Sequence, residues 1–144
     1  MISNDFKTKN IKDDYRFDAI LGEGAFGCGI EATKLDNDQT VEITMYKKDV
    51  LDPQEAANLT SQIAALHKLN HPNVVEMIEV YDNENAYYVV MEYMDGGELF
   101  DMITEQECYS ENLLANTIRP CIDAMRYCHG QGIAHGDLKV SFFN

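Results

Sequence analysis

A single change in the spacing of apolar residues divides this chain and limits the folds open to it. Short extended runs predominate from Tyr15 to about Val90, and helical spacing predominates after the glycine-containing residues 93–97. Strands followed by helices, rather than strands alternating with helices, predict an α+β fold. We expect antiparallel strands at residues 17–21, 27–35, 41–46, 74–81 and 86–92. The predicted divisions are a polar lead-in (1–14), a strand-rich lobe (15–92) and a hinge with helices (93–144).

Helix signals accompany both halves of the chain. Asp52 is a typical N-cap, Pro53 suits the first helical position, and Glu55 completes a capping box. We therefore expect one helix inside the strand-rich lobe. After residue 97 we expect a short helix at 98–104 and a longer one capped by Ser110. The longer helix places apolar residues on one face, at Leu114, Ile118, Cys121, Ile122, Met125 and Cys128.

Composition excludes several classes of function. The chain has 25 acidic and 11 basic residues, for a net charge of −14, which excludes the basic surface that nucleic acids and anionic membranes require. No apolar run is long enough to span a bilayer, and the polar N-terminus lacks the apolar core of a signal peptide. The four cysteines include no C-x-x-C pair, so no zinc or dithiol site is predicted. We expect a cytoplasmic protein that binds neither nucleic acid nor membranes.

A glycine motif joins the first two predicted strands. Gly22-Glu-Gly24-Ala-Phe-Gly27 has the spacing G-x-G-x-x-G. A dinucleotide-binding fold would require this motif between a strand and a helix, so that interpretation fails. Between two strands, glycines let the backbone lie close over phosphate groups. A plain glycine-rich hairpin is the alternative interpretation of the motif taken by itself.

Further motifs follow in a fixed order. They are Val41-Glu-Ile-Thr44, Leu69-Asn-His-Pro-Asn73, the run 91–100 that contains Gly-Gly-Glu-Leu-Phe, and Ile133-Ala-His-Gly-Asp-Leu-Lys139. Together with the glycine motif, this series resembles the protein kinase family, and most closely its calcium/calmodulin-dependent Ser/Thr group. The resemblance implies an N-lobe of five antiparallel strands and one helix, a hinge, and the first helices of a C-lobe. It also implies ATP with Mg²⁺ as the cofactor.

The resemblance assigns roles to individual residues. Gly22, Gly24 and Gly27 would cover the phosphates, while Met91 matches the gatekeeper beside the hinge. Glu92 and Met94 would offer backbone groups to adenine, and Glu98 would contact the ribose or a basic substrate residue. Asp137 matches the catalytic-loop aspartate and Lys139 its neighbouring lysine.

Six positions depart from the family pattern. They are Gly29 for valine, Glu42 for alanine, Thr44 for the phosphate-binding lysine, Gln62 for its glutamate partner, Gly136 for arginine, and Phe142 for the metal-binding asparagine. We expect Gln62 to point inward, where it could form a neutral hydrogen bond with Thr44. Replacement of the missing lysine by Lys47 or Lys48 would require a shift in strand pairing. Glu42 and Gly29 would alter the apolar roof of the adenine site.

These departures predict an inactive kinase-like interaction module with weak or no binding of ATP. The sequence ends at Asn144 without a D-F-G motif, and we expect the second magnesium-binding position to be missing too. Without the usual cover, the face of the long helix would favour a protein partner or self-association. The alternatives are a Ser/Thr kinase fragment that retains ATP binding or phosphotransfer, and a decayed kinase product with no function of its own.

Overall fold

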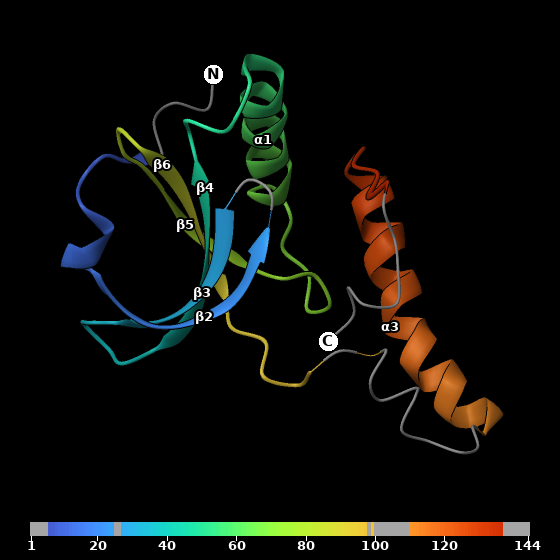
Figure 1. The fold of residues 1–144 in the computed structure, drawn as a ribbon. Helices are drawn as coiled ribbons and strands as arrows, with labels where there is room; N and C mark the ends of the chain where they lie inside the picture. Colours follow the sequence, from blue (N-terminus) through green and yellow to red (C-terminus); the bar gives the residue numbers. More distant parts are fainter. Residues whose placement is uncertain (1–5, 25–26, 98, 100–109, 137–144) are drawn as a thin grey trace. The chain divides into compact units, whose positions relative to one another are not determined.

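The computed structural model describes residues 6–24, 27–97, 99 and 110–136. The chain forms two compact units, which we describe separately. The first unit comprises Met1–Lys68 and Glu76–Tyr93, and the second comprises Leu69–Val75 and Met94–Asn144. Strands fill the first unit, and a long helix dominates the second (Figure 1). The predicted α+β class is confirmed.

The first unit is built on one sheet of six strands. The strands are β1 (Phe6–Lys7), β2 (Tyr15–Gly24), β3 (Gly27–Lys34), β4 (Thr40–Lys47), β5 (Met77–Asp82) and β6 (Ala86–Glu92). Their order across the sheet is β1-β5-β6-β4-β3-β2. All neighbours from β5 to β2 are antiparallel, as predicted.

The strand β1 lies in the segment that the sequence indicated as a lead-in. Phe6 and Lys7 pair in parallel with Val80 and Tyr81 of β5. The following 3-10 turn, η1 (Ile11–Asp13), places Ile11 in the core, where the residue is 1% exposed. Phe6 and Lys7 therefore belong to the sheet and Ile11 to its core, because even a two-residue strand can pack an aromatic side chain against its neighbours.

Both faces of the sheet carry apolar clusters. The larger cluster is formed by Ile11, Tyr15, Ile30, Ala32, Val41, Ile43, Tyr81 and Val90. The second cluster is formed by Leu59, Ile63, Val80 and Val89, with Phe6, Tyr46, Leu51, Met77, Tyr87 and Met91 packed around it. The alternation along β4 explains this division, since successive side chains of a strand point to opposite faces.

The helix α1 (Pro53–Leu66) packs against the sheet (Figure 1). The predicted capping box is present: the Asp52 carboxylate accepts a hydrogen bond from the Glu55 amide, and the Glu55 carboxylate accepts one from the Asp52 amide, both at 2.8 Å. Leu59 and Ile63 form the buried stripe of the helix and pack on Val80 of β5 and Val89 of β6. The capped start and the apolar stripe together hold α1 in place on these two strands.

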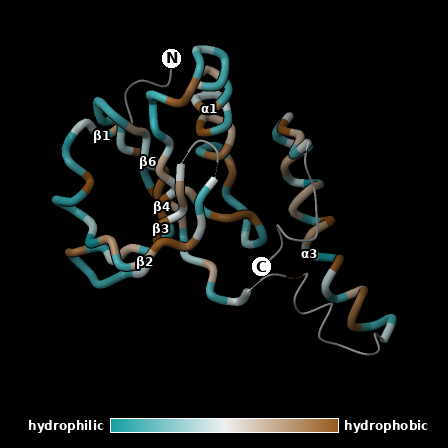
Figure 2. Tube along the Cα trace, in the orientation of Figure 1, coloured by the Kyte–Doolittle hydropathy of each residue, from teal (hydrophilic) through white to brown (hydrophobic). Residues whose placement is uncertain are grey.

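The second unit contains the helix α3 (Glu111–Gly130), which is capped by Ser110 as predicted. Ala124 and Cys128 are buried, and Figure 2 shows hydrophobic and hydrophilic residues interspersed along the helix. Segment 69–75 packs on α3, since the Asn70 amide donates to the Tyr127 hydroxyl at 2.9 Å and His71 stacks on the Tyr127 ring. The short helix expected at 98–104 lies largely outside the described residues. Within the described part of the chain, no helix is long and apolar enough to cross a membrane.

Candidate functional site

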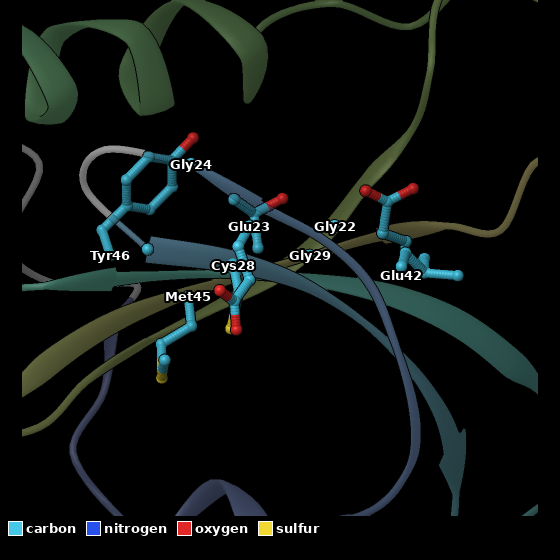
Figure 3. A pocket seen from close by; sticks show the side chains of 11 residues that line it. Gly22, Glu23, Gly24, Cys28, Gly29, Glu42, Met45 and Tyr46 are labelled. Atoms are coloured by element: carbon cyan, nitrogen blue, oxygen red, sulfur yellow. The ribbon is translucent and has the colours of Figure 1, made fainter.

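A pocket lies beneath the glycine hairpin, against β3 and β4. Its volume is about 420 Å³. The lining residues are Leu21, Gly22, Glu23, Gly24, Gly27, Cys28, Gly29, Glu42, Thr44, Met45 and Tyr46. Figure 3 shows Glu42 at one end of the pocket and Tyr46 at the other. The structure thus gathers the three predicted glycines with three of the six departing positions.

The three glycines have different surroundings. A Cβ added at Gly27 would lie 1.7 Å from the carbonyl oxygen of Met45, so the backbones of β3 and β4 leave no room for a side chain there. A Cβ at Gly24 would meet only the Gly27 oxygen, at 3.8 Å, and one at Gly22 would meet nothing within 4 Å. Only Gly27 is therefore required by the packing of the protein itself.

Thr44 lies on β4 between two neighbours, with Gly29 opposite on β3 and Val89 opposite on β6. Gln62 is exposed, so the expectation that it points inward is wrong. The buried stripe of α1 follows Leu59 and Ile63, and Gln62 is rotated by about 100° from Ile63. The described structure contains no hydrogen bond between Thr44 and Gln62, and the neutral pair suggested by the sequence does not form.

Neither nearby lysine replaces the family's phosphate-binding lysine. The Lys48 ammonium donates to the Asp82 carboxylate and lies 4.5 Å from the centre of the Tyr87 ring. Lys47 is exposed, and neither residue lines the pocket. The pairing of β4 with both neighbours is regular, so the shift that would move a lysine into the pocket is absent.

Glu42 brings a half-buried carboxyl group to the pocket. Burial raises its pKa above the usual range of glutamate, because a charge loses hydration when it leaves water. Burial also raises the pKa of Tyr46, and the Glu42 charge adds to that effect. Glu42 lies directly opposite Glu31 on β3. Gly29 and Glu42 both line the pocket, and the Glu42 carboxylate lies beside Gly29; their predicted effect on an adenine site stays a prediction.

The predicted hinge residues lie outside the lining of the pocket. Met91 packs against the cluster beneath α1. The Glu92 amide donates to the Glu76 carbonyl at 3.0 Å, and its carboxylate accepts from the Glu76 amide at 2.8 Å. Glu92 thus fixes the end of β6. Met94 is 39% exposed, and Glu98 lies outside the described residues.

The predicted catalytic loop is described only as far as Gly136. This residue has φ of 81°, a left-handed conformation that an arginine would adopt with strain. The backbone thus accounts for glycine at this position. Asp137, Lys139 and Phe142 lie outside the described residues, and their predicted roles remain predictions.

Other lining residues were missed from the sequence. Tyr46 follows Glu42 and Thr44 at a spacing of two, so the alternation along β4 could have placed it on the same face. Cys28 and Met45, which also line the pocket, gave no comparable signal. Their side chains belong to the opposite face of their strands, and only their closeness to the hairpin brings them to the pocket.

The charged side chains of the described pocket lining are acidic. Glu23 and Glu42 are its charged lining residues, and none of the lining residues is a lysine, arginine or histidine. Among the described residues there is also no group of three or more side chains suited to hold a metal ion. The described lining thus presents carboxylates and no cationic side chain to a ligand in this pocket.

Comparison with known proteins places the chain among kinases. The model of the protein kinase domain matches residues 15–142. The chain is 36% identical to a probable myosin light chain kinase of Dictyostelium discoideum over 133 residues, which cover 92% of this chain and 34% of that protein. It is 36% identical to the calcium/calmodulin-dependent protein kinase type 1 of Macrobrachium nipponense over 134 residues, covering 92% of this chain and 39% of that protein. The chain therefore spans less than half of the length of these relatives.

Proposed function

This chain belongs to the protein kinase domain family, and we propose that it acts as a kinase-like interaction module without phosphotransfer activity. The resemblance read from the motifs is confirmed at the level of the family, as part of a kinase domain. The observation that carries the proposal is the pocket beneath the glycine hairpin, which has Thr44 in place of a lysine and carboxylates as its charged groups.

Phosphoryl transfer depends on positioning and on neutralising the charge of the phosphates. A phosphate oxygen brought to about 4 Å from a carboxylate would be repelled by about 4 kcal/mol at an effective dielectric constant near 20. Each 1.36 kcal/mol lost from the transition state lowers the rate about tenfold. Thr44 offers no positive charge to offset this repulsion, and Lys48 is engaged with Asp82. We infer that Mg-ATP binds weakly or not at all and that transfer is lost.

Nucleotide binding without transfer is the second candidate function. It is favoured by the open space around Gly22 and Gly24, whose missing side chains would meet no close atoms. Backbone amides of such a hairpin could approach phosphate groups from above. The carboxylates at the same pocket act against this function, so we rank it below the interaction module.

The test compares the whole chain with two lysine variants. In thermal unfolding with millimolar Mg-ATP, we expect no shift for the wild-type chain. Thr44→Lys should gain a shift through contact with the phosphates, which does not require the base-binding half of the pocket, because a ligand that binds only the folded state raises its stability. Thr40→Lys adds the same charge to β4 at an exposed position outside the pocket and should gain none.

Two results would contradict the proposal. One is a clear stabilisation of the wild-type chain by Mg-ATP. The other is transfer of labelled phosphate to a peptide or to the chain itself that disappears in Asp137→Asn. The second result would establish phosphotransfer and assign it to this chain rather than to a contaminating kinase.

For the interaction itself we propose the exposed face of α3. Leu114, Ile118 and Ile122 are 42%, 45% and 61% exposed, and they follow one another at intervals of four residues. Self-association is the simplest form of such a contact. Sedimentation velocity should show a concentration-dependent oligomer that Ile118→Glu disrupts. Asn116→Glu adds the same charge at an exposed position about 200° away around the helix and should leave the oligomer intact; a wild-type chain that stays monomeric would contradict self-association.

A further inference from the structure

Two of the departing positions, Gly29 and Glu42, meet in the pocket. The register pairs Gly29 with Thr44 and Glu31 with Glu42, so Gly29 and Glu42 are diagonal neighbours on the same face of the sheet. A Cβ built on Gly29 would lie 3.5 Å from Oε1 of Glu42 and 3.7 Å from Cβ of Leu21. The carboxylate therefore occupies the space immediately above the glycine.

A branched side chain at position 29 would compete for this space. Contact at 3.5 Å is already ordinary van der Waals distance, and each Cγ of a valine extends about 1.5 Å beyond its Cβ. A methyl group directed at the carboxylate would overlap its oxygen. It would also remove water from a charged group, which is unfavourable. With its carboxylate in this position, Glu42 leaves room for glycine at 29, whereas a valine there would require one of the two side chains to turn away.

We propose that Gly29 and Glu42 form a reciprocal pair that closes the base-binding half of this pocket: the carboxylate fills the recess that glycine leaves open. The proposal deepens the proposed function, since it relies on the kinase-type site to identify which half of the pocket would take a base. It names the two residues that decide whether an uncharged planar ring can enter. The absence of the phosphate-binding lysine is a separate defect, at Thr44.

The pair predicts that binding of a flat ring requires both residues to be changed together. Glu42→Ala removes the carboxylate but leaves the recess without an apolar wall. Gly29→Val adds the wall but drives it against the carboxylate. Only the double variant provides both room and apolar contact for a flat ring. Effects of two residues in contact are expected to be non-additive.

The probe that tests this is adenosine, which carries no phosphate and needs no metal. Its dissociation constant is measured by calorimetry for the wild-type chain, both single variants and the double variant. We expect the double variant to bind at least about tenfold more tightly than either single variant, and the wild-type chain to show no binding. Equal affinities for the double variant and either single variant would overturn the pair, as would binding to the wild-type chain.

Melting temperatures of the same four proteins give a second readout. Gly29→Val should lower the melting temperature more in the wild-type background than in the Glu42→Ala background. Gly24→Val is the control, because the neighbour of Gly24 is the Gly27 carbonyl and not Glu42; its effect should be the same in both backgrounds. If the double variant fails to fold, the inference is overturned, because removal of the carboxylate should have made room for the valine.

The adenosine result is independent of the proposed lack of transfer. Phosphate transfer by the wild-type chain would contradict the proposed function even if adenosine bound only to the double variant. Conversely, loss of the coupling between positions 29 and 42 would remove the pair while Thr44 still left the chain without its phosphate-binding lysine.

Discussion

Substitution of Gly27 by alanine should separate the packing role of the glycine motif from any role in binding. The added Cβ would lie 1.7 Å from the Met45 oxygen and 2.8 Å from its carbonyl carbon. Both atoms belong to the backbone of β4, so no rotation of a side chain can relieve the overlap. Strands β3 and β4 would have to move apart at the residues where Gly27 pairs with Tyr46.

The expected cost follows from these distances. Overpacking that displaces backbone typically costs about 1–3 kcal/mol. Gly22→Ala and Gly24→Ala meet no close atoms and have no positive φ, so they should gain about 0.4–1 kcal/mol from the lower entropy of the unfolded chain. The Gly27 variant should therefore be about 1.4–4 kcal/mol less stable than its two matched controls.

Urea unfolding followed by circular dichroism measures this difference directly. The midpoint of Gly27→Ala should fall well below that of the wild-type chain, while the midpoints of the two controls should equal or exceed it. If Gly27→Ala unfolds at the same urea concentration as Gly22→Ala, then the close approach of β3 to Met45 is wrong. The pocket, which depends on that approach, would then be wrong as well.

Three further outcomes are expected. Burial acts to raise the pKa of Glu79, but hydrogen bonds from Lys7, Tyr15 and Tyr81 outweigh it, so the pKa of Glu79 is lowered. The contribution of Glu79 to stability is therefore complete above the unfolded pKa of about 4.3 and is lost as pH falls through the lower folded pKa. Glu79→Gln should accordingly flatten the acid side of a plot of stability against pH. Asp52→Ala removes the capping box of α1 and should lower the free energy of unfolding in urea by about 1 kcal/mol. A variant as stable as the wild-type chain would show that the cap does not contribute to stability. Gly136→Arg should cost about 1–2 kcal/mol because of its positive φ, and Gly130→Arg, which adds the same charge without positive φ, should not lower the melting temperature.

Much of the fold could be predicted because its signals are local. The alternation along β4 and the cap at Asp52 each involve residues within a few positions of one another. The strand β1 could not be found in this way, since two residues show no period and their partners on β5 lie more than 70 positions away. The polar cluster where the Tyr15 and Tyr81 hydroxyls both donate to Glu79 depends on the same distant contact.

The site was predicted unevenly for a related reason. The spacing of the motifs identified Gly29, Glu42 and Thr44, and strand register then brought all three to one pocket. Gln62 was placed wrongly because its distance from Leu59 suits a helix face several residues wide, while only the Leu59–Ile63 line is buried. Whether residues on either side of this line are buried depends on the neighbouring strands. The sequence of the helix does not specify where those strands lie.

The glycine motif can be present in a pocket whose described lining has no cation, because its three glycines are required for different reasons. Gly27 is required by the Met45 carbonyl whether or not a nucleotide binds. Gly22 and Gly24 face open space, so only a ligand or the loop itself would penalise side chains there. A glycine motif alone is therefore weak support for nucleotide binding in this chain. The residues that report on ligand chemistry are Thr44 and Glu42, because nothing in the packing of the sheet requires a threonine or a carboxylate where they stand.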